Sequence, residues 1–239
     1  MIVGIHQPNF FPWLGFFNRI LSCERFIFLD HVQIPTGKSW VSRNKLLISG
    51  ADRWLTLPTK KRSRMGQRID EVEINYESNF TKKHLRTIES NYGKTQYFKE
   101  VFPIIQRIYT ADHKLLVDFN LSFIHWVLDS WQCPTKCYRS SQLIAINPSL
   151  MHLTGNELIL EICATVDAKK YISGSGCLDF IKPNSFEERY INFNFQSFSH
   201  PEYDQIGAQQ FRSNLSILDC LFNQGLKRTQ TLVNPKDLR

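Results

Sequence analysis

The first twenty residues, MIVGIHQPNFFPWLGFFNRI, constrain the fold of this 239-residue chain more than any other segment. An apolar run at Ile2–Ile5 leads into the polar, proline-containing segment His6–Asn9, and an aromatic-rich stretch follows over residues 13–22. This order predicts a buried strand, a loop and a buried helix. Ligands of open α/β sheets bind beyond the carboxyl ends of strands, so Gln7 and its polar neighbours are candidate site residues. The alternative is that these side chains only satisfy the backbone of the turn.

The same order of strand and polar end recurs later in the chain. Short segments that we interpret as strands, at Phe26–Leu29, Thr135–Tyr138 and Lys170–Ile172, are each followed by polar residues, with helix-like segments between them. This alternation predicts an α/β fold with a mainly parallel central sheet and helices on both faces, which is a Rossmann-like arrangement. We expect a single domain over residues 1–225 and a loosely held tail over 226–239.

Polar residues that follow parallel strands should meet at one edge of the sheet. Asp30 within reach of His6 would raise the basicity of the imidazole and suit it to abstract a proton. The sequence Ser-Gly-Ser-Gly at residues 173–176 is a candidate anion-binding loop or a plain turn. We predict His6 and Asp30 as catalytic residues. The predicted substrate-binding residues are Gln7, Asn9, Gln33, Arg43, Asn44, Ser173, Gly174, Ser175, Gly176 and His200.

Two of these candidates, Arg43 and His200, have open alternatives. Arg43 could hold a phosphate or carboxylate through two N–H groups, or it could be a solvated charge on a hairpin arm. His200 is a second candidate for the general base, because histidine titrates near neutral pH.

Basic residues exceed acidic ones, and the formal net charge is +7. The densest run contains Lys60, Lys61, Arg62, Arg64 and Arg68, which we expect to form an exposed, mobile loop. A basic balance favours an anionic partner. The chain has no recognisable nucleic-acid-binding motif, so we expect a nucleotide-sugar or another phosphorylated small molecule rather than nucleic acid.

The six cysteines are scattered, and only Cys133 and Cys137 are closely spaced. This spacing does not predict a zinc site, and we expect free thiols in a reducing compartment. We predict no transmembrane segment, because no run of about 18 apolar residues occurs. The N-terminus also lacks signal-peptide features, so the expected location is the cytoplasm. The sequence identifies neither a cofactor nor an oligomeric state.

Several longer segments resemble the WbqC-like family. They are HQPNFFPWLGFF from His6, FIFLDHVQ from Phe26, the Arg43–Lys45 segment, HLRTIESNYGKTQYF from His84, RSSQL from Arg139, YISGSG from Tyr171, FSHPEYDQ from Phe198 and SNLSILDCLFN from Ser213. The resemblance covers the chain from Ile2 to the region of Phe222. Family members commonly have a second acidic residue after Asp30, where this chain has His31. An acidic pair therefore cannot hold a metal here in the same way.

Members of the family that these motifs resemble recur among genes for bacterial surface polysaccharides. The resemblance thus implies a role in the biosynthesis of such a polysaccharide, for example the O-antigen of lipopolysaccharide. Combined with the predicted site, it favours a transferase that attaches an acyl or aminoacyl group, such as glycyl, to the amine of a nucleotide-linked amino sugar. The alternatives are an adenylating or nucleotidyltransferase-like enzyme and a non-catalytic component of a glycan assembly complex.

Overall fold

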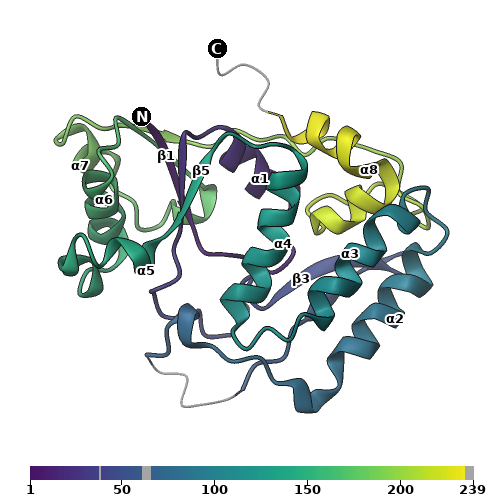
Figure 1. Ribbon diagram of the computed structural model, residues 1–239. Coiled ribbons are helices and arrows are strands. Elements are labelled where there is room, and N and C mark those ends of the chain that lie inside the picture. Colours follow the sequence, from purple (N-terminus) through teal and green to yellow (C-terminus); the bar gives the residue numbers. More distant parts are fainter. Residues whose placement is uncertain (38, 61–65, 235–239) are drawn as a thin grey trace.

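The computed structural model describes residues 1–37, 39–60 and 66–234 (Figure 1). Its central sheet has five strands in the order β5-β2-β1-β6-β7, and every neighbouring pair is parallel. The strands are β1 (Ile2–His6), β2 (Arg25–Phe28), β5 (Lys136–Arg139), β6 (Lys170–Ser173) and β7 (Asn192–Phe195). The predicted α/β fold with a mainly parallel sheet is confirmed.

Helices cover both faces of this sheet. Figure 1 shows α6 (Gly155–Thr165) and α7 (Pro183–Glu187) on one side, and α1 (Leu14–Leu21), α4 (Leu116–Ser130) and α8 (Ile217–Val233) on the other. Successive side chains of a strand point to opposite faces, so each strand contributes to two cores. The core beside α6 and α7 contains Val3, Ile5, Ile27 and Tyr171, whereas the core beside α1 contains Phe26, Phe28 and Ile172.

A second, smaller sheet lies outside the parallel one. It is the antiparallel hairpin of β3 (Arg43–Ile48) and β4 (Ala51–Thr56), in which Lys45 pairs with Trp54. The remaining helices are α2 (Phe80–Tyr92), α3 (Phe98–Thr110) and α5 (Ser140–Leu143), with 3-10 turns at Ile69–Glu71, Tyr76–Ser78, Pro148–Met151 and Ser175–Cys177. No helix in the described ranges is long and apolar enough to span a membrane.

The order of the strands reverses at β1. The next strand in the chain, β2, pairs with one side of β1, and β6 pairs with the other side. Such a reversal opens a crevice at the carboxyl edge, where open α/β sheets bind ligands. The loop over this edge is tied down, because Asn120 Nδ2 donates hydrogen bonds to the carbonyl oxygens of Pro8 and Val41, both at 2.8 Å.

The sequence also predicts a short strand at Ile69–Ile74, and this prediction is wrong. Ile69–Glu71 forms a 3-10 turn instead. The backbone N–H groups of Ile69 and Asp70 donate hydrogen bonds to the carbonyl oxygens of Val32 and Asp30, both at 3.0 Å. Its apolar side chains Ile69, Val72 and Ile74 are all buried, and only Val72 and Ile74 have the two-residue spacing of a strand.

Residues 226–233, which the sequence places in a loose tail, belong to α8. Val233 is fully buried, and its carbonyl oxygen accepts a hydrogen bond from Asn18 Nδ2 at 2.8 Å. Of the predicted basic loop, Lys61, Arg62 and Arg64 lie outside the described residues. Lys60 is exposed and forms an ion pair with Glu73 at 2.8 Å.

Candidate functional site

A buried arginine reaches the carboxyl ends of β1 and β6. Arg19 lies in the last turn of α1 and is only 3% exposed. Helical side chains point back toward the helix N-terminus, so Arg19 extends toward the carboxyl edge of the sheet. There Nη1 lies against Gly174, where a Cβ atom would collide with it. The absence of a side chain at Gly174 therefore makes room for the guanidinium group.

No acidic side chain among the described residues forms an ion pair with Arg19. Its Nε and Nη1 atoms are buried and have no hydrogen-bond partner among the described residues. Burial lowers the pKa of Arg19 from its ordinary value, but an arginine remains charged in proteins. A buried, unpaired cation is destabilising, and an anion with acceptor oxygens would offset that cost. Arg19 is thus the group in the crevice best suited to an anionic ligand.

His6 ends β1 near this arginine. Its Nδ1 atom lies 2.8 Å from the carbonyl oxygen of Gln7, which can only accept, so Nδ1 carries the hydrogen and Nε2 keeps a free lone pair. Burial first, and then the positive charge of Arg19, lower the pKa of His6 to about 3. The imidazole is therefore neutral at physiological pH. Asp30, predicted to raise this basicity, is bonded to Arg139 instead, at 2.6 Å.

We predict that the ring signals of His6 do not titrate in NMR spectra between pH 5 and pH 8. The pKa of His6 is about 3 in the folded chain, below its ordinary value of 6.5. Between these two pH values the unfolded chain therefore holds a proton on His6 that the folded chain does not. His6 therefore contributes most to the free energy of unfolding above pH 6.5, and this contribution is lost as the pH falls toward 3. Urea unfolding at pH 7 and pH 4.5 should show a smaller loss for His6→Gln than for the wild type. An equal loss would contradict the buried, neutral state of His6.

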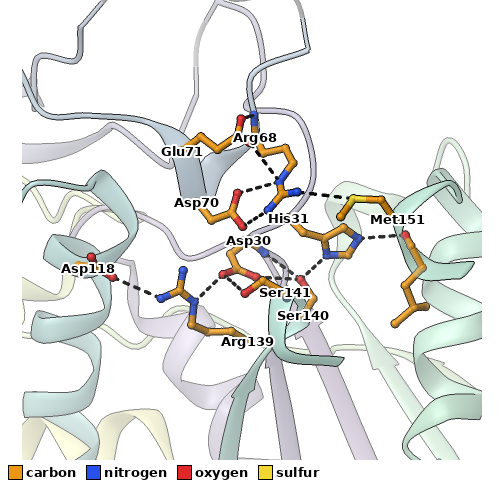
Figure 2. A network of polar contacts seen from close by, with 11 residues as sticks. Asp30, His31, Arg68, Asp70, Glu71, Asp118, Arg139, Ser140, Ser141 and Met151 are labelled. Carbon is orange, nitrogen blue, oxygen red and sulfur yellow. Dashed lines mark hydrogen bonds and ion pairs between the residues drawn. The ribbon is translucent and has the colours of Figure 1, made fainter. Parts of the chain in front are cut away.

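A second polar cluster surrounds Asp30, which follows β2 and is fully buried (Figure 2). Oδ1 accepts hydrogen bonds from Ser140 Oγ at 3.0 Å and Ser141 N at 2.8 Å. Oδ2 accepts from Arg139 Nε at 2.6 Å and Ser141 Oγ at 2.8 Å. The parallel pairing of β2 and β5 brings these donors beside Asp30. Both oxygens are occupied, so the carboxylate holds this edge together and is not free to take a proton from a substrate.

The charges around this cluster are balanced within it. Figure 2 shows Arg139 between Asp30 and Asp118, whose Oδ1 accepts from Arg139 Nη1 at 3.3 Å. Arg68 Nε donates to Asp70 Oδ1 at 2.9 Å in the same view. Each arginine here has an acidic partner, whereas Arg19 has none among the described residues.

His31 links the Asp30 cluster to the segment that contains Leu150. Its Nδ1 atom lies 2.7 Å from Ser140 Oγ, and its Nε2 atom lies 3.2 Å from the carbonyl oxygen of Leu150. Burial lowers the pKa of His31 from its ordinary value. His31 is therefore a buried hydrogen-bonding link between Ser140 and the backbone at Leu150.

Other predicted site residues near the opening loop have mainly structural contacts. Asn44 is buried, and its Nδ2 donates to the carbonyl oxygen of Phe11 at 2.7 Å. Asn9 is buried in the same loop, while Gln7 is half-buried. Gln33 is exposed, and its backbone bridges to Arg68.

The remaining predicted residues lie in three places. Ser173 ends β6 and is buried, and Gly174 adjoins Arg19, whereas Ser175 and Gly176 are exposed. His200 packs in an aromatic cluster with its ring stacked on Trp13 at 6.4 Å between centroids. Arg43 lies on the β3–β4 hairpin.

Four residues of the two clusters were missed in the prediction of the site: Arg19, Arg139, Ser140 and Ser141. The sequence does single out Arg19, because it is the one cation in the apolar helix segment LGFFNRIL. A helix that is buried all round has no solvent face for a charge, so the arginine is expected to extend into the interior of the protein. In the described part of the chain, no group of three or more His, Cys, Asp or Glu side chains could hold a metal ion.

The fold and site define a parallel α/β protein with an unpaired cation and a neutral histidine at its switch point. The chain belongs to the WbqC-like protein family, whose model matches residues 7–231. It is also 28% identical to the uncharacterized protein Rv1507c of Mycobacterium tuberculosis over 225 residues, which cover 93% of this chain and 94% of that protein. No solved structure matches the chain at a significant level. The family resemblance inferred from the sequence motifs is thereby confirmed.

Proposed function

We propose that this protein is a transferase whose phosphorylated substrate, a nucleotide-linked amino sugar, binds in the crevice between β1 and β6. The observation that carries the proposal is the buried guanidinium of Arg19, with two nitrogen atoms that lack an acceptor among the described residues. A phosphate offers oxygen acceptors and a negative charge, and arginine binds both in a planar geometry. The net charge of +7 supports an anionic substrate.

His6 supplies the acid–base chemistry in this proposal. Its neutral ring has a free lone pair on Nε2, which can take a proton from the amine of the sugar as that nitrogen attacks the carbonyl carbon of an acyl or aminoacyl ester or thioester. A C–N bond forms, the bond from carbonyl carbon to the oxygen or sulfur breaks, and the leaving group takes up a proton. Phosphate bound at Arg19 would offset the charge that lowers the pKa of His6, so substrate binding would make His6 a stronger base.

The Asp30 cluster positions the neighbouring strand end in this mechanism. β2 carries Asp30 and pairs with β1, and the backbone N–H of Leu29 donates to the carbonyl oxygen of His6 at 2.8 Å. A rigid β2 end therefore fixes the backbone at His6, which preorganises the base.

The proposal is tested with nucleoside diphosphate sugars that carry a free amine, each mixed with acyl-coenzyme A or an aminoacyl ester. Mass spectrometry should detect an N-acylated sugar nucleotide with the wild type. His6→Asn should abolish turnover while the affinity for the sugar nucleotide, measured by calorimetry, changes little. Tight binding without transfer from any donor would reject the transferase assignment, and absence of binding by every phosphorylated compound would reject the site.

A further inference from the structure

Two tryptophans lie exposed and in contact at the start of the β3–β4 hairpin. Trp40 is 43% exposed and Trp54 is 40% exposed, and their ring centroids are 5.0 Å apart. More than a third of each ring is exposed, and the contact between the two rings makes one continuous aromatic surface that a planar ligand could cover.

Two cations lie beside one ring of this pair, that of Trp54. Arg43 lies over the ring of Trp54 with its guanidinium carbon 4.1 Å from the centroid, and Lys45 Nζ lies 5.5 Å from the same centroid. The Nε and Nη2 atoms of Arg43 have no hydrogen-bond partner among the described residues. Lys45 is paired with Asp52 at 3.4 Å, so the charge left over is that of Arg43. The surface thus combines flat aromatic rings with a positive charge.

The aromatic pair is fastened to the loop that follows His6. The backbone N–H of Phe10 donates to the carbonyl oxygen of Trp40 at 2.9 Å. Asn120 Nδ2 joins Pro8 and Val41 through their carbonyl oxygens. The backbone that carries Trp40 is therefore fixed beside the loop that follows His6, which lowers the cost of ordering this side of the surface for a ligand.

We propose that Trp40, Trp54 and Arg43 form a stacking platform for the heterocyclic base of a nucleoside phosphate. A planar ring joined to a negative charge complements both parts of the surface, since bases stack on aromatic rings and on arginine guanidinium planes. This inference rests on the proposed function, because the base is that of the nucleotide-linked substrate. It assigns Arg43, predicted from the sequence to bind substrate, to the nucleoside part of that substrate.

The test compares uridine diphosphate with inorganic pyrophosphate, which lacks a base, by calorimetry and tryptophan fluorescence. Trp40→Ala should weaken uridine diphosphate binding roughly tenfold and leave pyrophosphate binding unchanged. Trp40→Phe should restore most of the affinity, because it keeps an aromatic ring. Tyr190→Ala removes an aromatic ring that is 92% exposed elsewhere and is the matched control, with no expected effect.

Unchanged uridine diphosphate affinity in Trp40→Ala would overturn the platform. So would fluorescence quenching by a neutral oligosaccharide but not by uridine diphosphate, which would indicate a glycan surface. If Arg19→Met still abolishes pyrophosphate binding in either case, the proposed phosphate site stands without the platform. If the wild type binds neither compound, both the site and the platform fail.

Discussion

Arg19→Met is expected to stabilise the free protein and to abolish binding of its phosphorylated ligand. The substitution removes a buried charge that has no partner among the described residues, and methionine fills a similar length of apolar space. Replacing buried charge by a well-packed apolar group can stabilise a protein by about 1–3 kcal/mol. For a chain of this size each kcal/mol corresponds to roughly 2–4 °C in the thermal midpoint. Loss of a charge-assisted contact should weaken phosphate binding by at least about 30-fold.

The matched control is Arg189→Met. Arg189 is an exposed arginine whose Nη1 lies 3.1 Å from Glu161 Oε2 at the surface. Its replacement should leave both the thermal midpoint and ligand binding nearly unchanged. An Arg19→Met variant that is less stable than the wild type and binds ligand normally would show that the guanidinium has a structural role. Scanning calorimetry with and without uridine diphosphate measures both quantities.

Asp30→Ala is expected to cause the largest loss of stability. Asp30 is fully buried and accepts from four donors, and its removal leaves Arg139 Nε, two hydroxyls and one backbone N–H without their acceptor. Breaking a buried pair in this way costs about 3–5 kcal/mol. The thermal midpoint should therefore fall by roughly 6–20 °C.

Asp118→Ala provides the control on the same arginine. Asp118 Oδ1 accepts from Arg139 Nη1 at 3.3 Å, but its side chain is 44% exposed. An exposed ion pair contributes less than about 1 kcal/mol, so this variant should unfold close to the wild type. Urea unfolding separates the two variants. Similar losses of unfolding free energy in both variants would mean that Asp30 stabilises this edge of the sheet no more than Asp118 does.

Much of the fold follows from local sequence patterns. The opening strand, loop and helix could be predicted because an apolar run, a proline-rich polar segment and an aromatic segment each have the length of one element. The parallel sheet followed from four strands that end in polar residues. The turn at Ile69–Glu71 could not be predicted, because its backbone bonds to Asp30 and Val32 come from a distant part of the chain. The same holds for the end of α8, which is held by Asn18.

The positions of several candidate residues in the sheet could be predicted, whereas their contacts could not. His6, Asp30 and Gly174 do lie at the carboxyl ends of neighbouring strands, as expected from a parallel sheet. Their partners depend on long-range packing. Asp30 bonds to residues more than a hundred positions later, and Arg19 meets Gly174 only because α1 packs back across β1. Sequence spacing does not reveal which acidic side chain contacts which basic one. We predicted that Asp30 pairs with His6, whereas in the structure it pairs with Arg139.

We propose above all that Arg19 binds the phosphate of the substrate. The most direct measurement is the side-chain 15N–1H NMR signal of Arg19 Nε, assigned by its loss in Arg19→Met and followed during titration with inorganic pyrophosphate and then uridine diphosphate. We predict a downfield shift of this signal that saturates with the calorimetric affinity, as a new hydrogen bond to a phosphate oxygen forms. An Arg19 signal that stays unchanged while the ligand binds and shifts other arginine signals would contradict the claim.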